Sequence, residues 1–163
     1  DRTRLVFNMC KTGLTGWQTA RLLEHKYGII PETADYYNVV CICTVVDRYK
    51  EIIGLANAMV DIHNSYGEKD ELAKMGYLPL PINERVIPLW KVQETNSKSI
   101  NILNAENEIC ADMITPYPPG IPVLYPGERL NGDVIEYITH IKDSGGMVNG
   151  ISDEGMIEIV CKG

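Results

Sequence analysis

The sequence predicts an α+β fold. Strand-like and helix-like stretches alternate along the 163 residues, and the first half runs strand, helix, strand, helix. This order is typical of helices packed on a sheet. Hydrophobic residues make up 45% of the chain and charged residues 23%, so a buried core can form. The length fits one domain or two small subdomains that share an interface.

The chain opens with a predicted strand and helix. Thr3–Met9 has the alternation of a strand with one covered face, and residues 15–27 have the apolar spacing of an amphipathic helix. Gly28 stands where a helix C′ residue belongs. The residues that point to one face of the strand are Leu5, Phe7 and Met9. The apolar side of the helix is formed by Gly16, Trp17, Ala20, Leu23 and Tyr27.

A second strand and a longer helix follow. Tyr37–Val46 is a near-continuous run of apolar and β-branched residues, which predicts a strand buried on both faces. Asp47 is then expected to cap a helix that ends near Ser65. The predicted inner stripe of this helix is Ile52, Leu55, Ala56, Met59, Val60 and His63.

The pattern fades between Gly67 and Leu89, where we expect only a short helix around residues 70–75. Three prolines in this stretch indicate a subdomain boundary, at Pro79, Pro81 and Pro88. We therefore expect one subdomain at residues 1–80 and a second at 81–163.

The second half is predicted from shorter signals. They are a strand at 99–102, a helical turn capped by Asn104, an extended piece at 109–115, a helix that starts at 131–133 with Val134, Ile138 and Ile141 inward, and a closing hairpin of 147–151 with 156–160.

A proline-rich segment, residues 115–128, is here named the strap. Five of the nine prolines fall within eleven of its residues, and proline fixes φ and removes a backbone donor. The strap is therefore expected to be stiff and extended, with Glu128 held at its end by Pro126-Gly127. Such a carboxylate suits recognition of a cation at low entropic cost. A rigid connector is the alternative, in which Glu128 pairs with Arg129 or faces solvent.

Other chemistry has weaker support. The net charge of −7 argues against a nucleic-acid or anionic-membrane surface, and no apolar run is long enough for a membrane span. The five cysteines lack metal-ligand spacing and are interpreted as reduced thiols of a cytoplasmic protein. The three histidines are interpreted as surface or capping residues, and no metal site is expected. The turn Gly13–Gly16 opens a helix, which makes only a weak case for an anion site.

The strap carries a family resemblance. Tyr117–Pro122 followed by Pro126-Gly127-Glu128 strongly resembles the C-terminal region of the bacterial ornithine/lysine/arginine decarboxylases, which are pyridoxal-phosphate enzymes with the aspartate-aminotransferase type of fold. The likeness extends over nearly the whole chain, although the other pieces are less specific. These pieces are Thr3–Met9 with Gly13–Gly16, Tyr27–Glu32, Val39–Asp47 and Asn131–Tyr137.

The resemblance implies a role for each half. Residues 1–80 would be the small subdomain of the aminotransferase-like fold, and residues 81–163 would be the decarboxylase C-terminal domain. In the intact enzyme a basic amino acid would lose CO₂ to give an amine of polyamine metabolism. Glu128 would then receive the distal cation of the substrate, and Tyr117 would shape the channel.

The catalytic lysine of that family is not expected in this chain. The family's Schiff-base lysine follows a histidine in a Ser/Thr-containing motif, whereas the one His-Lys pair here, His25-Lys26, lies in an amphipathic helix without that motif. The chain alone is therefore expected to be inactive. Its expected partner is an N-terminal cofactor-binding domain of the same enzyme, which would form a homodimer or a higher oligomer. The start at Asp1 also favours a piece of a longer protein.

Two other functions stay open from the sequence. One is a free-standing interaction or regulatory domain with the same fold. The other is an aminotransferase-like relative that carries out a different reaction.

Overall fold

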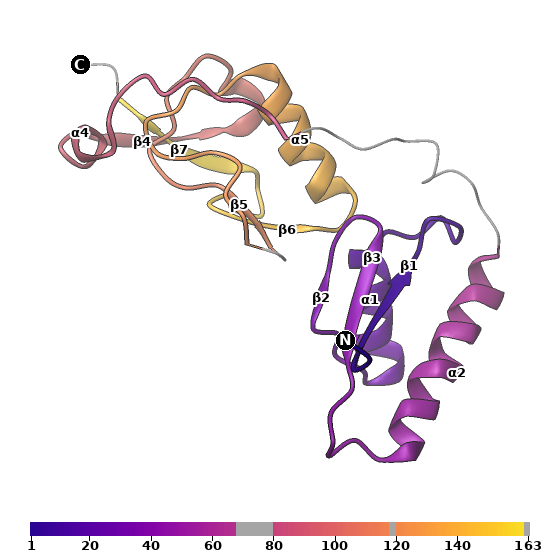
Figure 1. Ribbon diagram of the computed structural model, residues 1–163. Coiled ribbons are helices and arrows are strands. Elements are labelled where there is room, and N and C mark those ends of the chain that lie inside the picture. Colours follow the sequence, from indigo (N-terminus) through magenta and orange to yellow (C-terminus); the bar gives the residue numbers. More distant parts are fainter. Residues whose placement is uncertain (68–79, 118–119, 162–163) are drawn as a thin grey trace. The chain divides into compact units, whose positions relative to one another are not determined.

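The computed structural model describes residues 1–67, 80–117 and 120–161. Contacts between residues group the chain into two compact units. The first unit is Asp1–Tyr77 with Ser144–Gly146, and the second is Leu78–Asp143 with Met147–Gly163. Helices and strands occur in both units (Figure 1), which confirms the α+β prediction.

The first unit contains a three-stranded antiparallel sheet in the order β1-β3-β2. Its strands are β1 (Arg4–Asn8), β2 (Thr33–Ala34) and β3 (Asn38–Ile42). Val39 of the central strand lies opposite Phe7 on one side and Ala34 on the other. The expected alternation in the first strand is confirmed, because Leu5 and Phe7 are partly covered and Met9 is buried.

Helix α1 (Gly16–Tyr27) has the predicted bounds because both of its ends are encoded locally. Thr15 Oγ1 accepts from Gln18 N at 3.1 Å, and Gln18 Oε1 accepts from Thr15 N at 2.9 Å, which completes a capping box. Gly28 closes the helix with φ of 66°. Thr15 Oγ1 also donates to Ser144 O at 2.8 Å. The Thr15 hydroxyl and its partners thus occupy the N-terminus of α1, where the sequence makes only a weak case for an anion site.

The predicted second strand was too long. β3 ends at Ile42, and Val45 and Val46 are exposed in the turn that follows. The strand also alternates between buried and partly covered residues, so it is not buried on both faces. Asp47 closes this turn by accepting from the backbone N–H and the hydroxyl of Thr44, and does not cap a helix. The run of β-branched residues misled the prediction because it continues past the last paired residue.

Helix α2 (Tyr49–Tyr66) starts with Arg48 as its N-cap, and Glu51 Oε2 accepts from Arg48 N at 2.8 Å. Its buried residues are Leu55, Ala58 and Ile62. The predicted inner stripe was therefore wrong in part, since four of its members are exposed: Ile52, Ala56, Val60 and His63. Apolar residues occur on more than one side of α2, and periodicity alone could not identify the covered side.

The second unit contains two separate two-stranded sheets. Their strands are β4 (Ser97–Asn101) paired with β7 (Met156–Val160), and β5 (Thr115–Tyr117) paired with β6 (Met147–Asn149). The helical segments are α4 (Leu89–Gln93), the 3₁₀ turn η1 (Ile102–Asn104) and α5 (Gly132–Asp143). The inward residues of α5 are the predicted ones, Val134, Ile138 and Ile141.

Two local predictions in this unit were wrong. The last two strands do not form a hairpin, because β6 pairs with β5 and β7 pairs with β4, both far earlier in the chain. The turn between them does form, with Ser152 N donating to Met156 O. The 3₁₀ turn is capped by Asn101, whose side chain accepts from Leu103 N at 3.0 Å, and not by Asn104. The helix expected around residues 70–75 lies outside the described residues.

Within the described ranges, no helix is both long and apolar enough to cross a membrane.

Candidate functional site

The strap does not run as one extended ribbon. Val123 N donates to Ile114 O at 2.9 Å, and Ile114 pairs with Leu124 in an antiparallel bridge. Gly120 N donates to Pro116 O at 3.0 Å. The two arms therefore lie side by side, and the chain reverses between them. Proline rigidity predicted the extended arms but not their reversal.

The end of the strap is a tight turn. Glu128 N donates to Tyr125 O at 3.1 Å, and Gly127 has φ of 88°. With Pro126 at its second position, this is a type II turn. A Cβ on Gly127 would lie 2.2 Å from Ile87 O, so two backbones meet where only glycine fits. The turn thus fixes the backbone of Glu128 from both sides.

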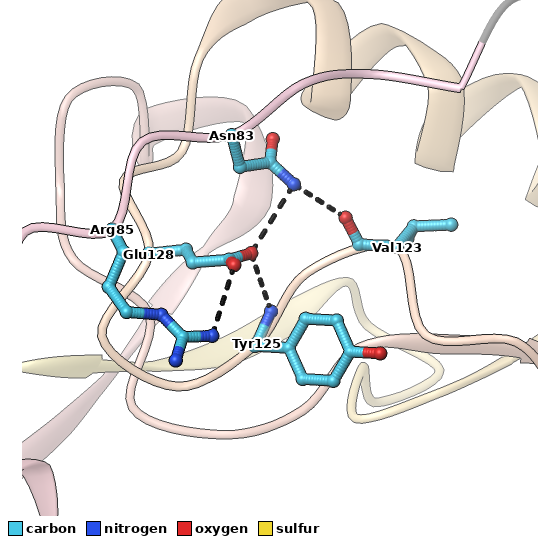
Figure 2. Close-up of polar contacts among 5 residues, drawn as sticks. All are labelled: Asn83, Arg85, Val123, Tyr125 and Glu128. Carbon is cyan, nitrogen blue, oxygen red and sulfur yellow. Dashed lines mark hydrogen bonds and ion pairs between the residues drawn. The ribbon is translucent and has the colours of Figure 1, made fainter. Parts of the chain in front are cut away.

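The carboxylate of Glu128 is held inside a small polar cluster, which Figure 2 shows. Its Oε2 accepts from Tyr125 N at 3.0 Å and from Asn83 Nδ2 at 3.4 Å. Asn83 Nδ2 also donates to Val123 O at 2.7 Å, which fixes its orientation. Oε1 pairs with Arg85 Nη2 at 3.4 Å. One carboxylate oxygen thus has two donors, and the other has a single distant one.

Exposure divides this cluster into an inner and an outer part. The Glu128 side chain is 12% exposed, whereas that of Arg85 is 54% exposed. Charge-assisted hydrogen bonds are usually 2.7–2.9 Å long, so the pair with Arg85 is loose and reaches solvent. The cluster therefore presents a carboxylate that is fixed in place and whose Oε1 pairs loosely with a solvent-exposed cation.

Arg129 is not the partner of Glu128. Its Nε pairs with Glu84 Oε2 at 3.1 Å, and the alternative of an Arg129–Glu128 pair is therefore wrong. Arg85 and Glu128 face each other in an antiparallel bridge. Sequence reasoning missed Asn83 and Arg85 because they lie in a stretch without periodicity. The one available signal was the Glu-Arg order that residues 84–85 and 128–129 share.

Tyr117 lies elsewhere on the strap. It is the last residue of β5, it pairs with Met147 of β6, and it is 52% exposed. Among the described residues, no hydrogen bond or ion pair joins Tyr117 to Glu128 or to the residues that hold it. The two predicted site residues thus belong to one segment but not to one cluster.

Cys110 holds the Pro126-Gly127 turn through backbone hydrogen bonds. Gly127 N donates to Cys110 O at 2.8 Å, and Cys110 N donates to Glu128 O at 2.9 Å. The thiol is buried and donates to Asp112 O at 3.0 Å. Burial raises the pKa of the Cys110 thiol to about 11. This cysteine is therefore a packed, protonated support and not a nucleophile.

Comparison with known proteins shows what this chain is similar to. The family profile described as "Orn/Lys/Arg decarboxylase, C-terminal domain" matches residues 89–155, which include the whole strap. The arginine decarboxylase of Bacillus subtilis (strain 168) is 31% identical over 158 residues, and that of Bacillus anthracis is 30% identical. Both alignments cover 94% of this chain. The chain matches the C-terminal portion of the Orn/Lys/Arg decarboxylase family.

Within this decarboxylase family the match is to a C-terminal portion. The chain spans 31% of the length of both Bacillus relatives. Lysine decarboxylases of Francisella novicida and E. coli share the fold, with TM-scores of 0.67 and 0.68 at 14% and 16% identity. Those alignments cover 99% of this chain and 31% or 32% of the solved chains. The family resemblance of the sequence is thereby confirmed.

The cofactor that the family resemblance implies is pyridoxal phosphate. Among the described ranges no lysine is buried within this chain, so none of them is enclosed here as an imine lysine would be. Lys26 of the His-Lys pair is exposed on α1 and pairs with Asp61 at 3.0 Å, and Tyr27 OH also donates to Asp61. No three His, Cys, Asp or Glu side chains of the described part are placed to hold a metal ion.

Proposed function

We propose that this chain is the C-terminal part of a decarboxylase that converts arginine, ornithine or lysine into the corresponding amine and CO₂. The observation that carries the proposal is the similarity to arginine decarboxylases over 94% of the chain. In the reaction the bond from Cα to the carboxylate breaks and a proton replaces the carboxylate. The domain assignment of the two halves, 1–80 and 81–163, is part of the same proposal.

Pyridoxal phosphate and its imine lysine would belong to the longer polypeptide, outside these 163 residues. When bound, the cofactor supplies the electron sink that decarboxylation needs. The chain alone is then inactive. The active enzyme is a cytoplasmic homodimer or higher oligomer of the longer polypeptide, active in polyamine metabolism.

Within this chain, we assign Glu128 to the distal cation of the substrate. The support is the asymmetry of its carboxylate, since Tyr125 N and Asn83 fix Oε2 while Oε1 pairs with the exposed Arg85. A substrate guanidinium or ammonium would take the place of Arg85 at Oε1. Tyr117, with its ring half exposed on the strap, would line the entrance.

The test is an assay of the full-length protein. CO₂ release from arginine, ornithine or lysine, dependent on added pyridoxal phosphate, is the expected result. A full-length gene product that starts at this chain favours a free-standing interaction or regulatory domain. A cofactor-dependent product that forms without CO₂ release favours an aminotransferase-like relative.

A further inference from the structure

Helix α2 carries two apolar stripes, and only one of them is covered. The inner stripe is Leu55, Ala58 and Ile62, which are buried. The second stripe, here named the outer seam, consists of Tyr49, Ile53, Ala56 and Val60. Tyr49 is 80% exposed, Ile53 39% and Val60 58%, and Ala56 is also exposed.

The outer seam lies nearly opposite the inner stripe. At 3.6 residues per turn, the centres of the two stripes are roughly 160° apart around the helix. Figure 1 shows α1 and the sheet of this unit to one side of α2. On one flank of α2 the stripes are separated by polar and charged residues: Lys50, Asn57, Asp61 and Asn64. On the other flank they are connected by Ile52, Met59 and Tyr66, of which Ile52 and Tyr66 are 38% and 36% exposed. The seam therefore lies on the side of the helix that faces away from the core.

The spacing of the outer seam indicates the shape of what covers it. Its members follow one another at intervals of four, three and four residues. That is the repeat with which one α-helix packs along another. Ala56, in the middle of the seam, allows the partner backbone to approach closely. The seam thus fits the apolar side of another helix.

The small size of the seam indicates where that helix comes from. Stable dimers of separate proteins bury about 20–30 residues on each side. The exposed apolar residues of α2 fall short of this number even when Ile52 and Tyr66 are added to the seam. A helix of the same polypeptide needs much less area, because the covalent connection removes most of the entropic cost of association. The relatives offer such a source, since this chain spans only 31% of their length.

We propose that the outer seam of α2 is covered by a helix of the longer polypeptide, from the part outside these 163 residues. This inference rests on the proposed function, which makes the chain the C-terminal part of a larger enzyme. It adds a defined docking face for the larger part.

The test compares two introduced thiols on the same helix. Val60→Cys places a thiol in the outer seam, and Asn57→Cys places a matched control on the exposed polar flank. Each variant is prepared both as the 163-residue chain and as the longer polypeptide. Maleimide labelling under native conditions, followed by peptide mass spectrometry, gives the rate at each position without removal of the natural cysteines. Ile53→Cys with Lys50→Cys repeats the comparison about two turns earlier.

In the 163-residue chain we expect positions 60 and 57 to label at rates within threefold of each other. In the longer polypeptide, position 60 should label at least tenfold more slowly than in the 163-residue chain, whereas the rate at position 57 should not change. Both rates should be the same at two protein concentrations that differ twentyfold. Equal rates at both positions in the longer polypeptide overturn the proposal. Slow labelling of position 60 in the 163-residue chain also overturns it, because the cover then lies within this chain. Protection that grows with concentration assigns the seam to a second copy instead.

The outcome is separable from that of the proposed function. The unmodified longer polypeptide is assayed in parallel for decarboxylation. Slow labelling of position 60 without CO₂ release would contradict the proposed decarboxylase function and support the docking face. CO₂ release with fast labelling of position 60 would support the function and contradict the docking face.

Discussion

Glu128 lies opposite Arg85 in an antiparallel bridge, and their side chains pair at 3.4 Å although they are 43 residues apart in the chain. The bridge aligns two segments in which glutamate precedes arginine. As a result each acid meets a base of the other segment, with Glu84 and Arg129 as the second pair. The carboxylate of Glu128 is thereby oriented and mostly shielded, while its cation remains at the surface.

Glu128→Gln in the longer polypeptide should lower kcat/KM by roughly ten- to a hundredfold. The loss corresponds to a charge-assisted hydrogen bond to the substrate cation of about 1.5–3 kcal/mol. The measurement is steady-state decarboxylation of the preferred substrate. Glu84→Gln is the matched control, because it removes the neighbouring acid of the same two segments and should leave kcat/KM within twofold. Unchanged kinetics for Glu128→Gln would make this residue a structural one.

Asn83→Asp should destabilise the chain by about 1–3 kcal/mol more than Asn83→Ala. Alanine only removes a donor to Glu128 and Val123, whereas aspartate adds a second carboxylate where two acceptors already face it. Urea denaturation of the three proteins at pH 7 measures the difference. Equal losses for both variants would show that Asn83 is not fixed in this orientation.

Gly127→Ala should cost about 2–4 kcal/mol of unfolding free energy. The added Cβ meets Ile87 O at 2.2 Å, and φ of 88° disfavours any side chain. Gly132→Ala is the control in the same unit, because its Cβ has no contact closer than 3.6 Å and its φ is not in the left-handed region. It should change stability by less than about 0.5 kcal/mol. Thermal unfolding of both variants checks the contrast, and a mild Gly127→Ala would contradict the close backbone approach.

Thr15→Ala should destabilise the first unit by about 1–2 kcal/mol, because Thr15 Oγ1 both caps α1 and donates to Ser144 O. Thr15→Ser keeps the hydroxyl and should retain most of the stability. Circular dichroism during thermal unfolding measures both. A serine variant as unstable as the alanine variant would assign the loss to packing of the methyl group.

Stability should fall as pH rises from 9 to 11, in part because of Cys110. Burial raises the pKa of its thiol from 9.0 to about 11, so the unfolded chain releases this proton first. The contribution is complete below pH 9 and is lost as pH rises through the folded value, for a total of about 2–3 kcal/mol. Urea denaturation across this range should give a steeper decline for the natural chain than for Cys110→Ala. Parallel curves would show that the thiol does not titrate differently in the two states.

The features predicted correctly from the sequence are those that neighbouring residues decide. The bounds of α1 follow from Thr15 and Gly28, which terminate the helix through local hydrogen bonds and a left-handed backbone. The type II turn at Pro126-Gly127 is encoded just as locally, although the sequence is interpreted there as part of an extended strap. The strap signature also pointed to the family, because closely spaced prolines and glycines constrain a short segment strongly.

The errors concern features that distant residues decide. β3 stops where its partners stop, and nothing in Val45 or Val46 marks that limit. The hairpin predicted at the end of the chain does not form, because its two strands pair instead with β4 and β5, which lie thirty or more residues earlier. The partner of Glu128 could not be read from its neighbours for the same reason. The role of Glu128 as a substrate ligand stays a prediction.

Three residues that sit between α5 and β6 in the chain, Ser144–Gly146, complete the first unit. The polypeptide therefore passes from one unit to the other three times, not once. A gene shortened after residue 80 would encode the first sheet and both of its helices, yet leave the hydroxyl of Thr15 without its acceptor. Anyone dissecting the protein by truncation would have to supply that tripeptide separately, or accept a first half with a loosened cap.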